Sequence, residues 1–241
     1  MKLSEKKDLI TNLSEFVTEA RRQKIESILQ QRTRHVTVIL EDIYQPHNAS
    51  ACLRSCESFG VQDVHIIENR NDFDLNREVS VGSDRWLSLY RYKQQCDPAE
   101  ISSTREGAPT EPEINHTKIC LEKLKSQGYK IVATTPHEKE MTVEQISVEE
   151  KLGLMFGTEL NGLSDYAFSQ ADYLVRIPMV GFSESFNISV SVALCLYEIT
   201  KRLRESNIDW RLNEIEQVEI KLKWLRQSIR GSSSIEKRLL N

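Results

Sequence analysis

The chain has 241 residues, of which 39 % are hydrophobic, and a formal net charge of −4, so it can bury one ordinary core. No uncharged apolar run approaches the roughly 18 to 20 residues of a membrane-spanning helix, and the amino terminus has acidic residues but no signal-type apolar stretch. These features exclude a membrane protein, and we expect a cytoplasmic one.

The first predicted elements are a helix, a strand and a second helix. Residues 14–31 carry apolar side chains at helical spacing, and the short β-branched run 36–40 predicts a buried strand. A helix then opens at Pro46 and ends before Gly60, because proline favours the first turn and glycine the position just past the end. Two more short strands are predicted over residues 64–67 and 86–90.

Strands and helices continue to alternate along the rest of the chain. Between residues 93 and 113 the composition changes to proline, serine, threonine, glycine and acidic residues, which predicts an exposed loop or insertion. The later predicted strands are 130–134, 152–156 and 173–177, and the later helices are 118–126, 190–204 and 212–229. This alternation predicts an α/β fold, with a mostly parallel sheet and helices on both faces.

The two ends of the chain differ from its middle. We expect residues 1–34 to form an amino-terminal helical extension, 35–205 the α/β core, and 206–241 a carboxy-terminal helical extension packed on the core or on a second subunit. Residues 1–35 carry eight basic and five acidic side chains and residues 200–241 carry ten and six, so the acidic excess lies between them. A polyanion would be attracted to the ends, although solvated helices would carry the same charges.

The usual phosphate-binding, hydrolase and metal motifs are missing. No two of the nine glycines lie two residues apart, so neither GxGxxG nor a P-loop can be written. The segment Gly181-Phe182-Ser183-Glu184-Ser185 is not the GxSxG elbow of serine hydrolases. The five cysteines are an odd number without CxxC spacing, which indicates free thiols and no metal site.

Polar residues instead follow three of the predicted strands. They are Asn48 and Arg54 after the first strand, Glu159 after the strand 152–156, and Ser185, Asn187 and Ser189 after the last. Because the carboxyl ends of parallel strands share one edge of the sheet, we expect these groups to converge. Each also has an ordinary alternative: Asn48 or Ser189 as a helix cap, Glu159 in a turn, and Arg54 as a surface cation.

Three segments that contain these residues resemble, in order and spacing, the three motifs of the SpoU/TrmH branch of the SPOUT methyltransferases. The segments are LEDIYQPHNASACLRSCESFGV, LMFGTELNGLS and VRIPMVGFSESFNISVSVALCLYEI. Motifs of this combined length are highly specific, and the resemblance covers residues 20–230 apart from the insertion. It implies methylation of an RNA ribose 2′-hydroxyl with S-adenosylmethionine as cofactor, by a fold that contains a deep trefoil knot.

The resemblance also implies the residues of the cofactor site. Contacts to S-adenosylmethionine, largely through backbone atoms, would come from Thr134, Gly157, Ile177, Met179 and Phe186. The family often has leucine at the position of Phe186, an exchange that keeps an apolar contact. It often has a more basic or aromatic pair at Leu160-Asn161, so this departure could alter substrate contacts.

The implied reaction needs alignment and a means of deprotonating the hydroxyl, since the sulfonium already activates the methyl group. The family residue matching Arg54 is proposed to accept the proton, assisted by the substrate phosphate. A phosphate clamp that lowers the hydroxyl pKa is an equal alternative, because a guanidinium normally stays charged. Asn48 would orient Arg54 or the ribose, Glu159 would fix the loop or the substrate, and Ser185 and Asn187 would shape the catalytic loop.

Within the family, the chain looks most like the members that act on guanosine 18 in the tRNA D-loop, because ARRQKIESILQQR runs directly into the first strand and a helix follows Trp210. The implied RNA contacts are Arg21, Arg22, Lys24, Arg32 and Arg34. We also expect a homodimer. Methylation of ribosomal RNA or of another tRNA position stays open, as do an RNA-binding protein without activity and an unrelated nucleotide-binding enzyme.

Overall fold

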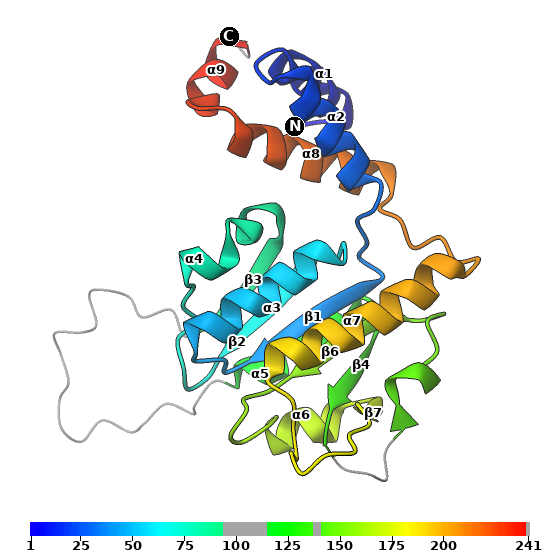
Figure 1. The fold of residues 1–241 in the computed structure, drawn as a ribbon. Helices are drawn as coiled ribbons and strands as arrows, with labels where there is room; N and C mark the ends of the chain where they lie inside the picture. Colours follow the sequence, from blue (N-terminus) through cyan, green and yellow to red (C-terminus); the bar gives the residue numbers. More distant parts are fainter. Residues whose placement is uncertain (94–114, 137–140, 240–241) are drawn as a thin grey trace, which may run out of the picture.

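The computed structural model describes residues 1–93, 115–136 and 141–239. The insertion predicted over residues 93–113 falls outside the described residues, apart from Lys93. The described chain forms one α/β domain with a helical bundle attached to it, and the bundle lies at the top of the view in Figure 1.

The centre of the α/β domain is a seven-stranded sheet in the order β3-β2-β1-β6-β4-β7-β5, with every pairing parallel. The strands are β1 (Val36–Glu41), β2 (Asp63–Glu68), β3 (Ser88–Lys93), β4 (Tyr129–Thr134), β5 (Met141–Thr142), β6 (Lys151–Phe156) and β7 (Tyr173–Arg176). The parallel sheet is confirmed. The sequence did not predict β5, which is a two-residue edge strand and too short to show a pattern.

Helices cover both faces of the sheet, as predicted (Figure 1). The helices are α1 (Leu3–Ser14), α2 (Glu19–Leu29), α3 (Pro46–Ser58), α4 (Arg77–Ser80), α5 (His116–Ser126), α6 (Asp165–Gln170), α7 (Ile188–Glu205), α8 (Glu214–Ser228) and α9 (Ser232–Leu239). Successive side chains of β1 point to opposite faces. Val38 and Leu40 join the core beneath α3 and α7, whereas Ile39 joins the core beneath α5 and α6.

The bundle is built from both ends of the chain. The helix predicted over residues 14–31 corresponds to α2, which begins later than predicted because Thr18 accepts a hydrogen bond from the backbone N–H of Arg21. Helix α1 lies before it and was not predicted as a separate helix. Helices α1 and α2 share one apolar core with α8, in which Leu13 and Leu29 pack with Leu225. The two terminal extensions therefore form one packed unit.

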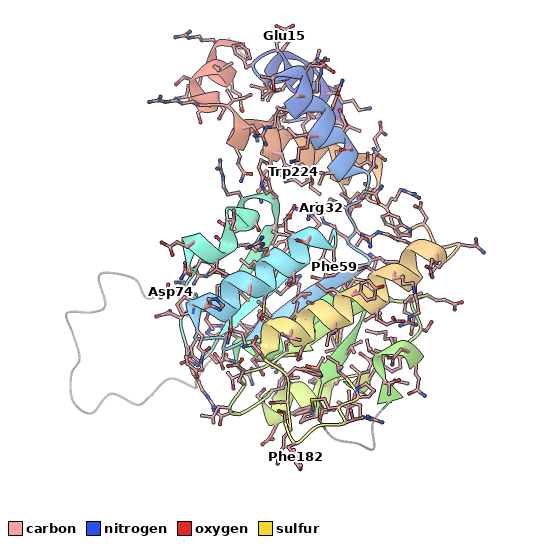
Figure 2. All side chains as sticks on the ribbon, viewed as in Figure 1. Glu15, Arg32, Phe59, Asp74, Phe182 and Trp224 are labelled. Atoms are coloured by element: carbon pink, nitrogen blue, oxygen red, sulfur yellow. The ribbon has the colours of Figure 1, made fainter. Side chains whose placement is uncertain are left out.

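A buried arginine joins the bundle to the α/β domain. Arg32 is 1 % exposed, its guanidinium lies 2.8 Å from the Glu57 carboxylate, and it donates to the carbonyl of Val61. The same guanidinium lies over the ring of Trp224, whose indole donates to the carbonyl of Trp86. Figure 2 shows Arg32 and Trp224 between the two units. Arg32 was predicted as an RNA contact, but its burial leaves no surface for one.

The turn between α4 and the short 3-10 helix at Ser83–Trp86 is strained at Val81. Val81 has φ +47°, a left-handed conformation that a β-branched residue adopts at a cost of about 1–3 kcal/mol. We expect Val81→Gly to raise the free energy of unfolding by about 1 kcal/mol, which chemical denaturation would measure. The matched change Val79→Gly, inside α4, should lower it instead. An unchanged or lowered stability of Val81→Gly would contradict the strain.

The cysteines that the structure describes are free and buried, as the sequence predicted for them. Burial raises the pKa of the Cys56 thiol to about 12, so it behaves as a small apolar side chain. None of the helices in the described ranges is long and apolar enough to cross a membrane.

Candidate functional site

Three polar residues that follow different strands meet at the carboxyl edge of the sheet. The side-chain amide of Asn187 donates to Asn48 Oδ1 at 3.1 Å and to Glu159 Oε1 at 2.5 Å. Asn187 also begins α7, because its Oδ1 accepts from the backbone N–H of Ser189 at 2.9 Å. The predicted convergence is confirmed for Asn48, Glu159 and Asn187, and Asn187 is the cap of α7 rather than Ser189.

A pocket of about 390 Å³ lies beside this cluster, at the ends of β4, β6 and β7. Its lining includes all five residues expected at the cofactor site, namely Thr134, Gly157, Ile177, Met179 and Phe186. Glu159 and Ser185 line it as well. Apolar walls with a few polar groups at the edge are typical of a small-molecule site.

The loop after β6 forms one wall of the pocket and requires a glycine. Thr158 and Gly162 exchange two backbone hydrogen bonds, of 3.0 and 2.9 Å, that fold the loop back on itself. A Cβ at Gly157 would lie 2.1 Å from the carbonyl oxygen of Gly162, so no other residue fits without moving the loop. The tip of the loop, Leu160 and Asn161, is exposed.

Arg54 does not join the strand-end cluster within one chain. It lies six residues beyond Asn48 on α3, roughly 9 Å further along the helix. Asn48 instead donates to Gln45 Oε1 at 2.6 Å, a contact that the sequence did not predict because Gln45 lies just before the helix. The exposed guanidinium of Arg54 has no ion pair or hydrogen bond with the residues that the structure describes.

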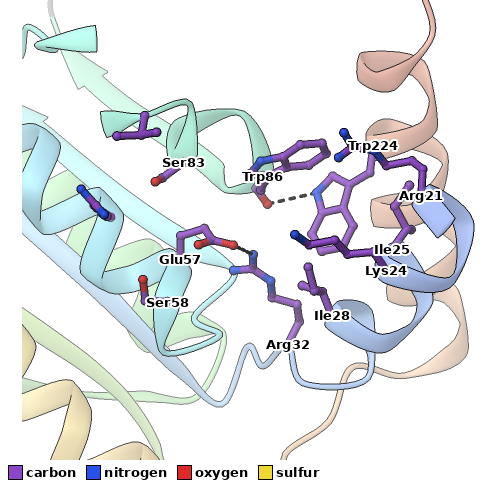
Figure 3. A pocket seen from close by; sticks show the side chains of 12 residues that line it. Arg21, Lys24, Ile25, Ile28, Arg32, Glu57, Ser58, Ser83, Trp86 and Trp224 are labelled. Carbon is purple, nitrogen blue, oxygen red and sulfur yellow. Dashed lines mark hydrogen bonds and ion pairs between the residues drawn. The ribbon is translucent and has the colours of Figure 1, made fainter. Parts of the chain in front are cut away.

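Arg54 lines a second pocket, of about 350 Å³, between α3 and the bundle. Arg21 and Lys24 of α2 lie on the opposite wall, and Figure 3 shows them beside Trp224. Four cationic side chains thus line one cavity, and one of them, Arg32, is paired with Glu57. Sequence reasoning placed these residues near RNA but could not show that α2 faces α3.

The other two predicted RNA contacts are engaged with protein carboxylates. Arg34 lies 3.0 Å from Asp63 and 3.2 Å from Glu216, and its side chain is 22 % exposed. Its charge is therefore already compensated by two carboxylates, and its role as an RNA contact stays a prediction. Arg22 forms an exposed ion pair with Glu19 of the same helix, and such a pair contributes little and can open toward solvent.

Comparisons with known proteins identify the family of the chain. A family described as the SpoU rRNA Methylase family matches residues 35–107 and 102–197. A tRNA (guanosine(18)-2′-O)-methyltransferase of Borreliella burgdorferi is 40 % identical over 224 residues, which cover 93 % of this chain and 93 % of that protein.

Two solved structures share the fold. The A. aeolicus TrmH/SpoU tRNA modifying enzyme matches with a TM-score of 0.72 and 24 % identity, over 88 % of this chain and 98 % of that chain. The SpoU methyltransferase AviRb from Streptomyces viridochromogenes, in complex with the cofactor AdoMet, matches with a TM-score of 0.54 and 20 % identity, over 75 % and 62 %. With its three motifs brought to one sheet edge, and with these matches, the chain belongs to the SpoU methylase family.

Proposed function

We propose that the protein methylates the 2′-hydroxyl of a tRNA ribose, at guanosine 18 of the D-loop, with S-adenosylmethionine as methyl donor. The observation that carries the proposal is the meeting of Asn48, Glu159 and Asn187 beside a pocket lined by the five expected cofactor residues. The tRNA and the guanosine come from the name of the relative that is 40 % identical.

The pocket suits S-adenosylmethionine. Its volume of about 390 Å³ is ligand-sized, and Phe156, Val175 and Ile188 give it an apolar wall for an adenine ring. The carboxylates of Glu159 and Glu184 line it too, where they would face a sulfonium or an ammonium group. When bound, the cofactor supplies an electrophilic methyl group on a positively charged sulfur.

The residues of the chain have separate parts in the reaction. Asn187 and Asn48 fix one another and the start of α7, so they present a rigid polar surface to the ribose. Arg54, with Arg21 and Lys24, holds the RNA backbone, because guanidinium groups bind phosphate oxygens in pairs. With the phosphate held in this way, the Arg54 guanidinium stabilises the developing 2′-oxyanion and so lowers the pKa of the 2′-hydroxyl. In the alternative role, Arg54 accepts the proton itself, which requires its guanidine to be neutral before the transfer.

The proposal includes a homodimer and a cytoplasmic location. It also includes a carboxy-terminal trefoil knot and a division into a helical extension (1–34), a methyltransferase domain (35–205) and a second helical extension (206–241). Support for the dimer comes from α7, which exposes Val190, Leu194 and Tyr197 to 43 %, 39 % and 56 %. Apolar side chains repeated along one helix face favour a protein partner. Sedimentation of the pure protein would test the dimer, and a monomer at micromolar concentration would exclude it.

Methyl transfer to defined RNA tests the function. Radiolabelled S-adenosylmethionine would be incubated with a tRNA transcript and with the same RNA carrying 2′-deoxyguanosine at position 18. We expect incorporation only into the first, with the modified nucleotide mapped by mass spectrometry. Incorporation confined to ribosomal RNA would contradict the tRNA assignment, and no incorporation with any RNA would favour a binding protein.

The loop after β6 gives a direct test of the cofactor pocket. We expect Gly157→Ala to weaken S-adenosylmethionine binding at least tenfold, because the added Cβ forces the loop away from its position. Isothermal titration would measure the affinity. Gly181→Ala is the matched control, since nothing lies within 4 Å of a Cβ there. Equal affinities of the two variants would place the cofactor elsewhere.

A further inference from the structure

A third pocket, of about 400 Å³, opens at the same edge of the sheet, behind the loop after β6. Its walls come from the ends of β1 and β2, the starts of α5 and α6, and that loop. The chain runs outward from β1 through β2 to β3, while β4, β6 and β7 lie on the other side of β1. The pocket therefore lies where the strand order reverses, which is where open α/β sheets bind ligands.

The floor of this pocket is rigid and fully hydrogen-bonded. Glu41 is 2 % exposed, and its carboxylate accepts the hydroxyls of Thr117 and Ser164 at 2.6 and 2.9 Å and the backbone N–H of Ser164 at 2.8 Å. The side-chain amide of Asn69 donates to Thr117 at 2.8 Å. A buried carboxylate satisfied in this way holds the starts of α5 and α6 in fixed positions.

The rim, in contrast, carries polar groups without protein partners. Asp42, at φ +56°, uses Oδ1 to accept the backbone N–H groups of Asn69 and Arg70 at 2.7 and 2.8 Å. Its Oδ2 accepts no hydrogen bond from the residues placed in the structure. The guanidinium of Arg70 and the side chains of Asn161 and Asp165 are likewise unpaired within the described ranges. Hydrogen-bond donors and acceptors without partners among the described residues are thus gathered at the mouth of this pocket.

The charges of the pocket distinguish its ligand from a phosphate. Glu41, Asp42 and Asp165 face a single cation, Arg70, so an anion would be repelled, unlike in the basic pocket around Arg54. A metal ion does not fit either, because no group of His, Cys, Asp and Glu side chains among the described residues could hold one. A neutral, planar group with several hydrogen-bond donors and acceptors fits this pocket, and Tyr166 adds an aromatic ring to its wall.

We propose that this pocket receives the guanine base of the nucleotide being methylated, an inference that rests on the proposed function. The carboxylates of Asp42 and Asp165 accept the N1–H and the 2-amino group, and Arg70 donates to O6. Thr158, Asn161 and Gly162 line both this pocket and the cofactor pocket, so one loop separates them. A nucleotide displaced from its stack can place its base on one side and its ribose on the other.

The test compares guanosine with inosine, which lacks the 2-amino group, at the target position of otherwise identical tRNAs. Asp42→Asn keeps the Oδ1 acceptor and tolerates the left-handed backbone, but replaces the free acceptor with a donor. We expect kcat/KM for guanosine to fall at least tenfold in Asp42→Asn and in Asp165→Asn, and the preference for guanosine over inosine to disappear in the variant of the carboxylate that accepts the 2-amino group. Affinity for S-adenosylmethionine should not change. The control is Asp74→Asn, an exposed carboxylate outside the pocket, which should behave as wild type.

Two outcomes would overturn the base pocket: an unchanged kcat/KM in both variants, or an equal loss with guanosine and inosine in both. Failure of the wild-type protein to methylate any RNA would instead contradict the proposed function. In that case NMR titration with free guanosine tests the pocket alone. Shifts of the Asn69 and Asn161 resonances in the wild type but not in Asp42→Asn would support it, and absent shifts would overturn it.

Discussion

Arg54→Lys should lower kcat/KM for tRNA methylation by about 10²- to 10³-fold while leaving the fold unchanged. Lysine keeps the positive charge but loses the planar fork that binds two phosphate oxygens at once. Because Arg54 is exposed and pairs with none of the described residues, its replacement removes no internal contact. Single-turnover methylation would measure the loss, and thermal unfolding would show that stability is unchanged.

Arg22→Lys is the matched control for Arg54→Lys, because Arg22 is also exposed and its only ion pair in the described chain is with Glu19. Near-normal turnover of Arg54→Lys would exclude both the clamp and the proton-acceptor role. An RNA with an uncharged methylphosphonate beside the target ribose probes the phosphate directly. If Arg54 acts through that phosphate, the loss from the RNA change and the loss from Arg54→Lys should not add.

Arg32→Ala should lower the free energy of unfolding by about 3–5 kcal/mol, the second large effect that we predict. The change removes the buried partner of Glu57, a donor to the Val61 carbonyl and the group packed on Trp224. Figure 3 shows Arg32, Glu57 and Trp224 meeting in the joint between the bundle and α3. Urea denaturation followed by tryptophan fluorescence would measure the change, since Trp86 and Trp224 both lie there.

Arg22→Ala serves as the reference for Arg32→Ala and should change stability by less than about 0.5 kcal/mol, since its ion pair is exposed. Measuring RNA affinity of Arg32→Ala beside its stability also distinguishes a structural role of Arg32 from a role in RNA binding. A stable Arg32→Ala protein with weakened RNA affinity would restore Arg32 as an RNA contact and contradict its assignment to the joint.

The sequence pattern predicted two kinds of element: strands that are buried on both faces, and helices whose ends are marked by nearby residues. The strand Val36–Glu41 is apolar almost throughout because both of its faces are covered, and that pattern is visible without a structure. Pro46 in the first turn and Gly60, with a positive φ just past the end, marked the helix between β1 and β2 in the sequence. The meeting of Asn48, Glu159 and Asn187 followed from strand polarity, since parallel strands end at one edge.

The positions of the arginines could not be predicted in this way. Arg21, Arg32 and Arg54 look alike in sequence and line the same cavity, yet Arg32 is buried and paired whereas Arg54 is exposed. The difference depends on Trp224, which lies almost two hundred residues further along the chain. Helix α1 was also missed as a separate element, and the start of α2 was placed too early because the cap at Thr18 was not recognised.

The bundle has a consequence for how the protein is made. Lys6 and Glu219 lie 2.7 Å apart across 213 positions, and the first helices complete their core only with α8. At about 5–20 residues per second, the ribosome exposes α1 and α2 for roughly 10 to 40 s before α8 emerges. During that interval Leu9, Leu13 and Leu29 have no partner from α8. We therefore expect chains stalled before Glu214 to recruit chaperones at their first thirty residues.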